Sequence, residues 1–207
     1  MAAPSAFVPG SALADAAAWA IEMHKDQVRK ATGIPYVSHL FAVAALAMEH
    51  GADEDQTVAA LLHDIIEDTP ATFEQVDERF GPRVAEIVAA CSERHGDPKP
   101  KWRLRKETYL DHVGLMPTEA LVVTIADKLH NARSIRRDLA VQGLPMFARF
   151  TAADPDDQLW YYESLVDAYR ARTVDDEALT ALVDQLDAVV AEIRTQVEAL
   201  VSAEPPS

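Results

Sequence analysis

The amino-acid sequence predicts an all-α protein, a helical bundle with a C-terminal helical extension. Hydrophobic residues make up 49% of the 207 residues, and glycine occurs only seven times while alanine and leucine are abundant. This composition favours helices over a turn-rich β-fold. Apolar residues also recur at helical spacing in successive segments, with glycine, proline and capping residues between them. A chain of this length can bury a core within a single domain.

Three helices are predicted in the N-terminal third of the chain. Apolar spacing predicts the first over residues 13–28, followed by a break at Gly33 and Pro35. The second is expected over 38–50. The third begins after a capping aspartate and extends over 53–69, where a Thr-Pro pair ends it. Its run VAALLHDII indicates burial on most sides.

Further helices are predicted in the rest of the chain. Thr72 and Gln75 form a capping box, and helices follow over 82–92, over 103–115 and from Thr118 through EALVVTIADKLHNARSIRRDL, with a basic loop at 93–102. Two more helices follow Pro145 and Pro155, the last with an apolar stripe from Leu179 to Leu200. We therefore expect a main domain over 1–140 and an extension over 141–207 packed on it. A dimer seam along the stripe is the alternative, so the chain is expected to be a monomer or a homodimer.

Charge and hydropathy exclude several classes of partner. The formal net charge of −15 argues against nucleic-acid binding, which depends on clustered basic residues. Of the 19 basic residues, 13 lie within 25–30, 94–106 and 128–137, as a small anionic ligand would need. Apolar runs are far shorter than the roughly 20 residues needed to span a bilayer. The N-terminus has no basic leader ahead of an apolar core, so we expect a cytoplasmic protein with no membrane partner.

Ionisable residues inside apolar helices are the strongest functional signal. His63-Asp64 interrupts one apolar helix, Asp127 another, and His39 lies on the preceding predicted helix. A buried carboxylate is costly unless it is paired or binds a metal. A lone His-Asp pair is more often structural, but two imidazoles and two carboxylates together suit Mn²⁺, Fe²⁺ or Zn²⁺ with coordination positions left open. The set indicates a catalytic metal.

Two further acids lie one helical turn beyond this pair. Glu67 follows His63 by four residues, and Asp68 follows Asp64 by four. Carboxylates beside a metal can activate water and manage its proton. An acidic surface at a helix C-terminus is the alternative explanation, although acids are unfavourable there.

Four segments resemble the HD hydrolase domain of RelA/SpoT-type proteins, especially the small stand-alone alarmone hydrolases. They are HKDQVRKATGIPYVSH, AALLHDIIEDT, FGPRVAEIV and ADKLHNARS, which occur in this order within about residues 13–140. The resemblance implies an HD-domain helical bundle and one Mn²⁺, held by His39, His63, Asp64 and Asp127. It also implies that Glu67 and Asp68 activate water.

The same resemblance implies a nucleotide site. Arg29 and Lys30 correspond to a pair that contacts the nucleotide, and Asn131 and Ser134 are similar to residues that hold the ribose and its phosphate, although relatives often have threonine at the latter position. Basic loop residues that are candidates for phosphate contacts are Lys99, Lys101, Arg103 and Lys106. The tail resembles a closing helix in which an aromatic approaches the ligand, here Trp160 or Tyr161, with the core as the alternative. His24, His112 and His130 are expected to be structural or solvent-facing.

These inferences predict a phosphohydrolase. The expected reaction is removal of the 3′-pyrophosphate of (p)ppGpp, giving GDP or GTP and pyrophosphate. Alternatives are the same chemistry on ppApp, the 2′-phosphate of NADPH or a simple nucleotide, and a non-catalytic alarmone-binding module. About 67 residues follow Ala140, too few for an alarmone synthetase, so we expect degradation without synthesis.

Overall fold

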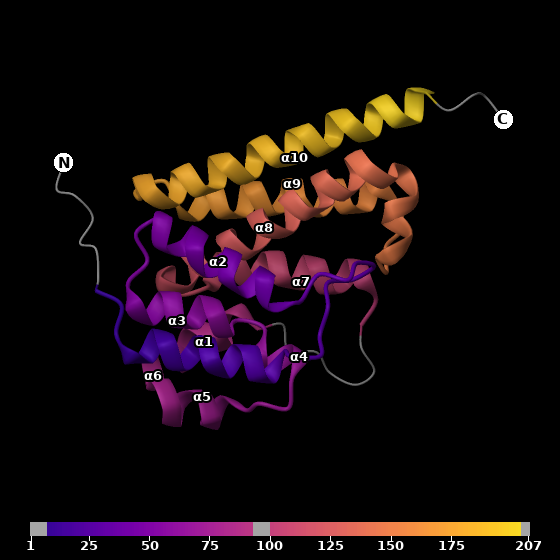
Figure 1. The fold of residues 1–207 in the computed structure, drawn as a ribbon. Coiled ribbons are helices and arrows are strands. Elements are labelled where there is room, and N and C mark those ends of the chain that lie inside the picture. Colours follow the sequence, from indigo (N-terminus) through magenta and orange to yellow (C-terminus); the bar gives the residue numbers. More distant parts are fainter. Residues whose placement is uncertain (1–7, 93–99, 204–207) are drawn as a thin grey trace. The chain divides into compact units, whose positions relative to one another are not determined.

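The structure is a computed structural model that describes residues 8–92 and 100–203. The chain forms two compact units, one from Met1–Arg94 and Met116–Asp127 and the other from His95–Leu115 and Lys128–Ser207. All regular secondary structure in the described residues is helical, which confirms the predicted fold class (Figure 1). None of the described helices is both long enough and apolar enough to cross a membrane. The predicted division at residue 140 stays a prediction.

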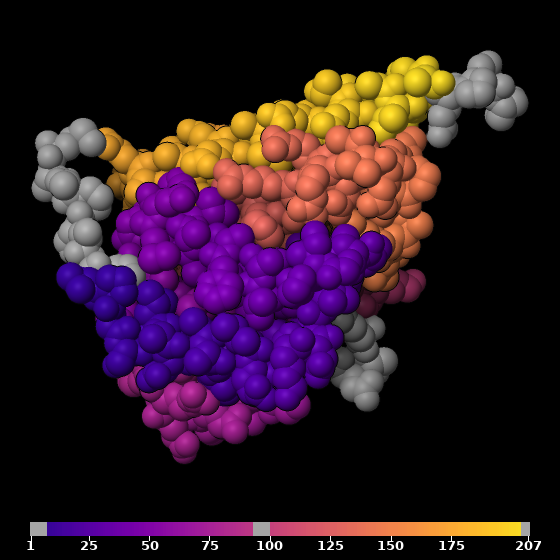
Figure 2. All heavy atoms as spheres, viewed as in Figure 1, coloured from indigo at the N-terminus to yellow at the C-terminus, as the bar shows by residue number. Residues whose placement is uncertain are grey.

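The first unit is built around α3. Its helices are α1 (Ser11–Met23), α2 (Val37–Glu49), α3 (Glu54–Leu62), α4 (Ile65–Asp68), α5 (Phe73–Phe80), α6 (Pro82–Cys91) and the beginning of α8 (Thr118–Gln142). Helices α1, α2 and α6 all pack on α3, and residues 58–62 of α3 are at most 2% exposed. Helices α1 and α2, in indigo and purple, form most of the face of this unit that Figure 2 shows. The apolar run therefore lies in the core, as its sequence predicts.

Local capping sets where the helices begin. Thr72 and Gln75 form the predicted capping box at the start of α5, and Asp53 with Gln56 forms another at the start of α3. Helix α2 ends just before Gly51, whose φ of 85° is accessible to glycine at little steric cost. These starts and stops follow from residues close together in the sequence.

The predicted third helix is interrupted, which corrects the sequence analysis. Instead of running on to Thr69, α3 ends at Leu62, and the separate turn α4 follows it. Asp64 lies between them with φ −99° and ψ −1°, in a sparsely populated region of backbone conformation. Periodicity could not predict this break, because the apolar spacing of VAALLHDII continues across it.

The connection from α1 to α2 is a tight hairpin, which we call the 27–36 hairpin. Helix α1 ends at Met23 instead of the expected residue 28, because the Gln27 amide donates back to the His24 carbonyl (3.0 Å). The Tyr36 amide donates to the Gln27 carbonyl (2.9 Å), and an isolated bridge joins the residues just inside this pair. The left-handed residue of the turn is Ala31, with φ 58°, although glycine follows two residues later.

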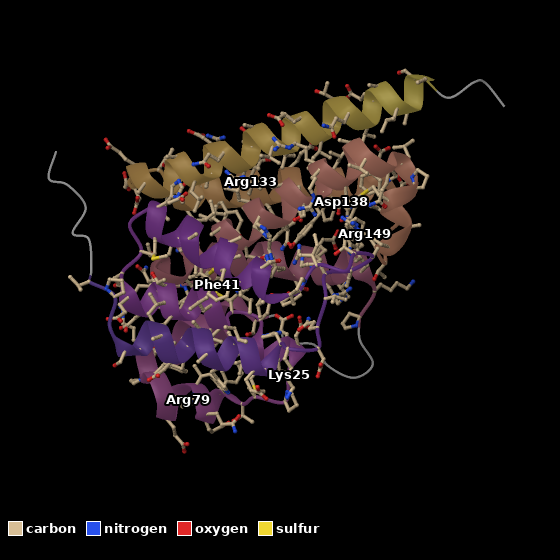
Figure 3. The ribbon with its side chains drawn as sticks, viewed as in Figure 1. Lys25, Phe41, Arg79, Arg133, Asp138 and Arg149 are labelled. Carbon is tan, nitrogen blue, oxygen red and sulfur yellow. The ribbon has the colours of Figure 1, made fainter. Side chains whose placement is uncertain are left out.

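The second unit contains α7 (Trp102–Leu115), the remainder of α8, the 3-10 helix η1 (Leu144–Arg149), α9 (Pro155–Arg172) and α10 (Glu177–Ala203). Helix α9 packs on both α7 and α10 (Figure 1). The predicted apolar stripe of α10 is buried from Leu179 to Val197. Helix η1 is joined to α8 by a 2.6 Å hydrogen bond that Arg149 of η1 donates to Asp138 of α8 (Figure 3). The stripe is thus used for packing within this unit.

Arg83 of α6 links the starts of α3 and α8 and yields a stability prediction. Its guanidinium pairs with Asp53 (2.7 Å), Asp55 (2.9 Å) and Glu119 (3.0 Å), and these hydrogen bonds raise the pKa of Arg83. Because the group is partly exposed, we expect Arg83→Gln to lower the free energy of unfolding by only about 1–2 kcal/mol, from several weak pairs and the repulsion left between acids. The loss should shrink at high salt.

Urea denaturation at low and high salt checks this expectation. The matched control is Arg136→Gln, which removes an ion pair of 2.5 Å with Glu192 in the second unit. It should cost less, because only one carboxylate loses its partner. Equal losses of unfolding free energy in the two variants would show that the three ion pairs of Arg83 stabilise the fold no more than a single pair does.

Candidate active site

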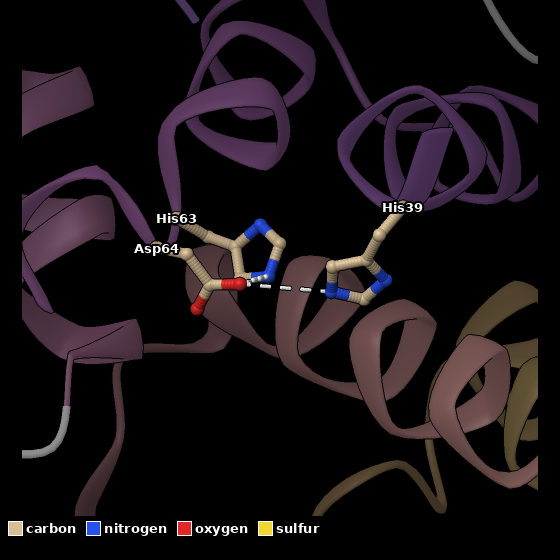
Figure 4. A group of neighbouring side chains, drawn as sticks. All are labelled: His39, His63 and Asp64. Carbon is tan, nitrogen blue, oxygen red and sulfur yellow. Dashed lines mark ion pairs between the residues drawn. The ribbon is translucent and has the colours of Figure 1, made fainter. Parts of the chain in front are cut away.

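Four ionisable side chains meet inside the first unit. His39 comes from α2, His63 and Asp64 from the junction of α3 and α4, and Asp127 from α8. His39, His63 and Asp127 are 1%, 3% and 7% exposed, and Asp64 is partly buried. Figure 4 shows both imidazoles directed toward the Asp64 carboxylate. Residues that are far apart in the sequence therefore form one polar cluster in an apolar environment.

The distances show that one ion could contact His39, His63 and Asp64, with Asp127 beside both imidazoles. His63 Nε2 lies 3.0 Å from Asp64 Oδ2 and 3.8 Å from Asp127 Oδ1. His39 Nε2 lies 3.2 Å from the same Asp127 oxygen and 3.6 Å from the same Asp64 oxygen. The ligand atoms of His39, His63 and Asp64 lie within 4.8 Å of one another. Two nitrogens and one oxygen thus lie close together, and an oxygen of Asp127 lies beside both nitrogens.

The other ring nitrogen of His63 fixes its orientation. Nδ1 lies 2.8 Å from the carbonyl oxygen of Ala60, which can only accept, so Nδ1 holds the hydrogen. Nε2 then points into the cluster, where it is buried and has no hydrogen bond of adequate geometry within the described residues. A backbone carbonyl on one nitrogen, with the other nitrogen directed into the cluster, is the usual arrangement of a metal-binding histidine.

The charges of the cluster are strongly coupled. Burial tends to raise the pKa of Asp64, but the His63 and His39 imidazoles hold it well below its ordinary value. Burial tends to lower the pKa of His63, but Asp64 and Asp127 raise it well above its ordinary value. Asp64 is therefore an anion, and a cation that binds here displaces the proton of His63.

Tyr36 was not singled out from the sequence, but it contacts the cluster directly. Its hydroxyl donates a 2.5 Å hydrogen bond to Asp64 Oδ2, and its ring lies edge-on to His39 with centroids 5.5 Å apart. Burial first, and then the charge of Asp64, raise the pKa of Tyr36, so the phenol stays protonated and donates. The signal in the sequence was its position three residues before His39, about one helical turn.

The two predicted catalytic acids lie on α4. The Asp68 amide donates to the Asp64 carbonyl (3.0 Å), so Asp68 follows one turn after Asp64 even though the longer helix is broken. Its Oδ2 accepts a 2.8 Å hydrogen bond from Gln27 Nε2. Glu67 is exposed. Gln27, like Tyr36, belongs to the 27–36 hairpin and was not predicted as a site residue.

The predicted Arg-Lys pair lies in the same hairpin. The guanidinium carbon of Arg29 is 5.7 Å from the centroid of the Tyr36 ring, whose hydroxyl reaches Asp64. Lys30 is exposed beside it. Arg29 therefore contacts the ring of Tyr36, and the hydroxyl of Tyr36 contacts the cluster at Asp64.

The other predicted substrate residues belong to the second unit. Asn131 and Ser134 follow Asp127 on α8, at a spacing that places them on one helix face, and Ser134 donates to the His130 carbonyl (3.1 Å). Lys101 is exposed at the start of α7. Arg103 lies 3.1 Å from the centroid of Trp160 and pairs with Glu107 (3.0 Å). Lys99 lies outside the described residues.

Tyr161 and His24, which were also considered from the sequence, are both buried. Tyr161 is buried beside Trp102, with centroids 6.1 Å apart, so it forms part of the core of its unit. His24, expected to be structural or solvent-facing, is buried at 2% exposure and stacks on Tyr36.

The donor set of the cluster fits a divalent transition metal. Mixed imidazole and carboxylate ligands suit such ions, and four protein ligands leave coordination positions for water and substrate. The unsatisfied, buried Nε2 of His63 is the atom that such an ion would satisfy. The residues that would hold it are His39, His63, Asp64 and Asp127.

Comparison with known proteins agrees with this geometry. The guanosine-3′,5′-bis(diphosphate) 3′-pyrophosphohydrolase MESH1 of Xenopus tropicalis is 38% identical over 126 residues, which are 59% of this chain and 69% of that protein. The corresponding enzyme of Haemophilus influenzae is 36% identical over 139 residues, 61% of this chain. The matched residues make up only 20% of the length of the Haemophilus influenzae protein.

Two solved structures are also similar to this chain. A metazoan ortholog of SpoT, described as hydrolysing ppGpp and acting in starvation responses, has a TM-score of 0.68 at 28% identity, over 92% of this chain and 98% of that one. The protein lmo0812 of Listeria monocytogenes has a TM-score of 0.67 at 27% identity, over 76% of this chain and 99% of that one. A model of the HD domain matches residues 16–155. With its His-Asp cluster inside this match, the chain belongs to the HD domain family.

Proposed function

We propose that this protein is a metal-dependent hydrolase that removes the 3′-pyrophosphate of (p)ppGpp and releases GDP or GTP and pyrophosphate. The observation that supports it most is the buried cluster of His39, His63, Asp64 and Asp127, in which His63 Nε2 has no hydrogen bond within the described residues. The activity named for the MESH1 relative supports the choice of substrate. Mn²⁺ is the proposed ion, with Fe²⁺ or Zn²⁺ as alternatives.

The residues of the site divide the chemical work. A bound divalent cation lowers the pKa of water and offsets negative charge on phosphoryl oxygens. Asp64 and Asp127 would supply ligand oxygens to this cation, and Tyr36 fixes the orientation of Asp64 by its hydrogen bond. Glu67 and Asp68 take the proton of the attacking water and return one to the leaving group. Both acids lie on α4, directly after ligand Asp64.

The basic residues of the 27–36 hairpin are proposed to hold the nucleotide. Arg29 packs against Tyr36, so its charge lies near the place where the reacting phosphate must bind. In a chain of net charge −15 such a local cation opposes the general repulsion of an anionic ligand. Asn131 and Ser134 are proposed for the ribose and its phosphate, and Lys101 and Arg103 for further phosphate contacts.

The direct test is a substrate panel. The protein with Mn²⁺ is incubated with ppGpp, pppGpp, ppApp, NADPH and simple nucleotides, and the products are separated by chromatography. We expect GDP or GTP with pyrophosphate from the guanosine alarmones. Preferential turnover of ppApp or NADPH would move the assignment to another substrate of the same chemistry. Binding of ppGpp without turnover would make the protein a non-catalytic alarmone-binding module.

The ligand assignment predicts linked loss of metal and activity. We expect His63→Ala to abolish stoichiometric Mn²⁺ binding and turnover together, because one missing ligand leaves the charges of its neighbours uncompensated. Metal analysis and circular dichroism check content and fold. The control is His50→Ala, which removes an imidazole at the C-terminal end of α2, where its Nδ1 bonds the Leu46 carbonyl (2.8 Å). Full metal content in His63→Ala would remove His63 from the ligand set.

The role of Glu67 predicts a separation of binding from chemistry. Glu67→Gln keeps the shape of the side chain but cannot accept a proton, so kcat should fall by about 100-fold or more while metal content stays unchanged. Glu78→Gln is the control, because Glu78 is an exposed glutamate on α5. Near-normal kcat in Glu67→Gln would exclude Glu67 from proton transfer.

The nucleotide site predicts a selective effect of charge. Arg29→Ala should lower kcat/KM for ppGpp by about 10- to 100-fold, the value of one charge-assisted hydrogen bond, without changing metal content. Lys25→Ala removes the same charge four residues earlier, from an exposed ammonium paired with Glu22 (2.7 Å; Figure 3), and should have little effect. Equal losses would indicate a general electrostatic effect instead of a contact.

A further inference from the structure

Gln27 bridges a buried histidine and one of the proposed catalytic acids. Its Oε1 lies 2.5 Å from His24 Nδ1, and its Nε2 donates to Asp68 Oδ2 at 2.8 Å. His24 and Gln27 precede the metal-binding residues in the sequence, and neither was assigned a role from its motif. The three side chains form a continuous hydrogen-bonded row, which we call the His24–Gln27–Asp68 relay.

The direction of these hydrogen bonds is determined by chemistry. An amide oxygen can only accept, so His24 Nδ1 must donate to Gln27 Oε1. This contact fixes which end of the amide faces His24 and directs the NH₂ group toward Asp68. If the amide were reversed, its oxygen would face the carboxylate of Asp68 and its NH₂ group would face the Nδ1 hydrogen. His24 therefore sets the orientation that Asp68 requires.

The packing around His24 makes the relay rigid. His24 is 2% exposed and stacks on Tyr36 at a centroid distance of 5.3 Å and an interplanar angle of 21°. Its Nε2 is buried without a hydrogen bond to any described residue, so Nδ1 provides its polar anchoring. The backbone of Gln27 is held on both sides, by its bond to the His24 carbonyl and by the bond from the Tyr36 amide.

We propose that Gln27 and His24 are positioning residues that hold the Asp68 carboxylate in the orientation needed for proton transfer; this inference rests on the proposed function. Asp68 is exposed on a four-residue helix, where an unrestrained side chain would rotate among several rotamers. Gln27 engages Oδ2 and leaves Oδ1 to accept a proton. A neutral amide orients the carboxylate without neutralising its charge, as lysine or arginine would.

The test is a double-mutant cycle with the full chain, Mn²⁺ and ppGpp. Gln27→Met keeps the length of the side chain and removes both hydrogen bonds, so kcat should fall by about tenfold while KM and metal content change little. In the background of Asp68→Asn, the same substitution should cause little further loss, because Gln27 acts through Asp68. Gln142→Met, at the exposed end of α8, should leave kcat unchanged. Equal losses in both backgrounds would overturn the proposal.

Two variants of His24 provide an independent check. His24→Phe keeps an aromatic ring for the stack on Tyr36 but has no donor, so it should reproduce the kcat loss of Gln27→Met. His24→Asn can place an amide donor near the position of Nδ1 and should recover part of the loss. Equal kcat in the two variants would assign His24 to packing and remove it from the relay.

A spectroscopic measurement separates failure of the relay from failure of the proposed function. Nitrogen NMR of the imidazoles should show His24 protonated at Nδ1 in the wild-type chain and a shifted Nδ1 signal in Gln27→Met. An unshifted signal overturns the relay whatever the substrate is. Absence of ppGpp hydrolysis by the wild-type chain overturns the proposed function, and with it the catalytic purpose of the relay, while the hydrogen bonds remain measurable.

Discussion

The buried charge of Asp64 is the constraint on which the rest of the first unit depends. A carboxylate placed beside a second one, Asp127, is stable only when cations or hydrogen-bond donors surround it. His39, His63 and Tyr36 meet this requirement at 2.5–3.6 Å from Asp64 Oδ2. They come from α2, the end of α3 and the hairpin before α2, so these segments must converge. Residues 57–62 of α3 are buried, because α1, α2 and α6 pack around the helix that leads to His63.

The 27–36 hairpin orients the acids of the site through the side chains at its two ends. Its two ends lie side by side through the hydrogen bond from the Tyr36 amide to the Gln27 carbonyl, and their side chains reach two acids that are one helical turn apart. Tyr36 holds Asp64, and Gln27 holds Asp68. Arg29, in the turn between them, packs on the ring of Tyr36. Ligand geometry, acid orientation and the proposed nucleotide contact therefore depend on one short segment, and a change in its backbone should affect all three.

Much of this arrangement could be predicted from the sequence, for local reasons. The capping box at Thr72 and the burial of residues 58–62 follow from neighbouring residues, and acids within apolar helices are unusual enough to indicate the metal cluster. The break at Asp64 could not be predicted, because the apolar spacing continues across it and the side-chain partner of Asp64 is 28 residues away. Gln27 and Tyr36 were not predicted as site residues for a related reason. Glutamine and tyrosine are common on protein surfaces, and the carboxylates that these two residues bind, Asp68 and Asp64, are distant in the sequence.

The choice of donors around the carboxylates agrees with a metal site that binds an anion. The donors that reach Asp64 and Asp68 from the hairpin are a phenol and an amide, which are neutral and add no positive charge beside the carboxylates. A lysine or arginine in either place would form a strong ion pair with the carboxylate and compete with the metal for it. Of the two cations in the same segment, Arg29 lies against the face of Tyr36 and Lys30 is exposed. Neutral groups thus orient the acids, and the positive charge of the hairpin stays available for the proposed contact with phosphates.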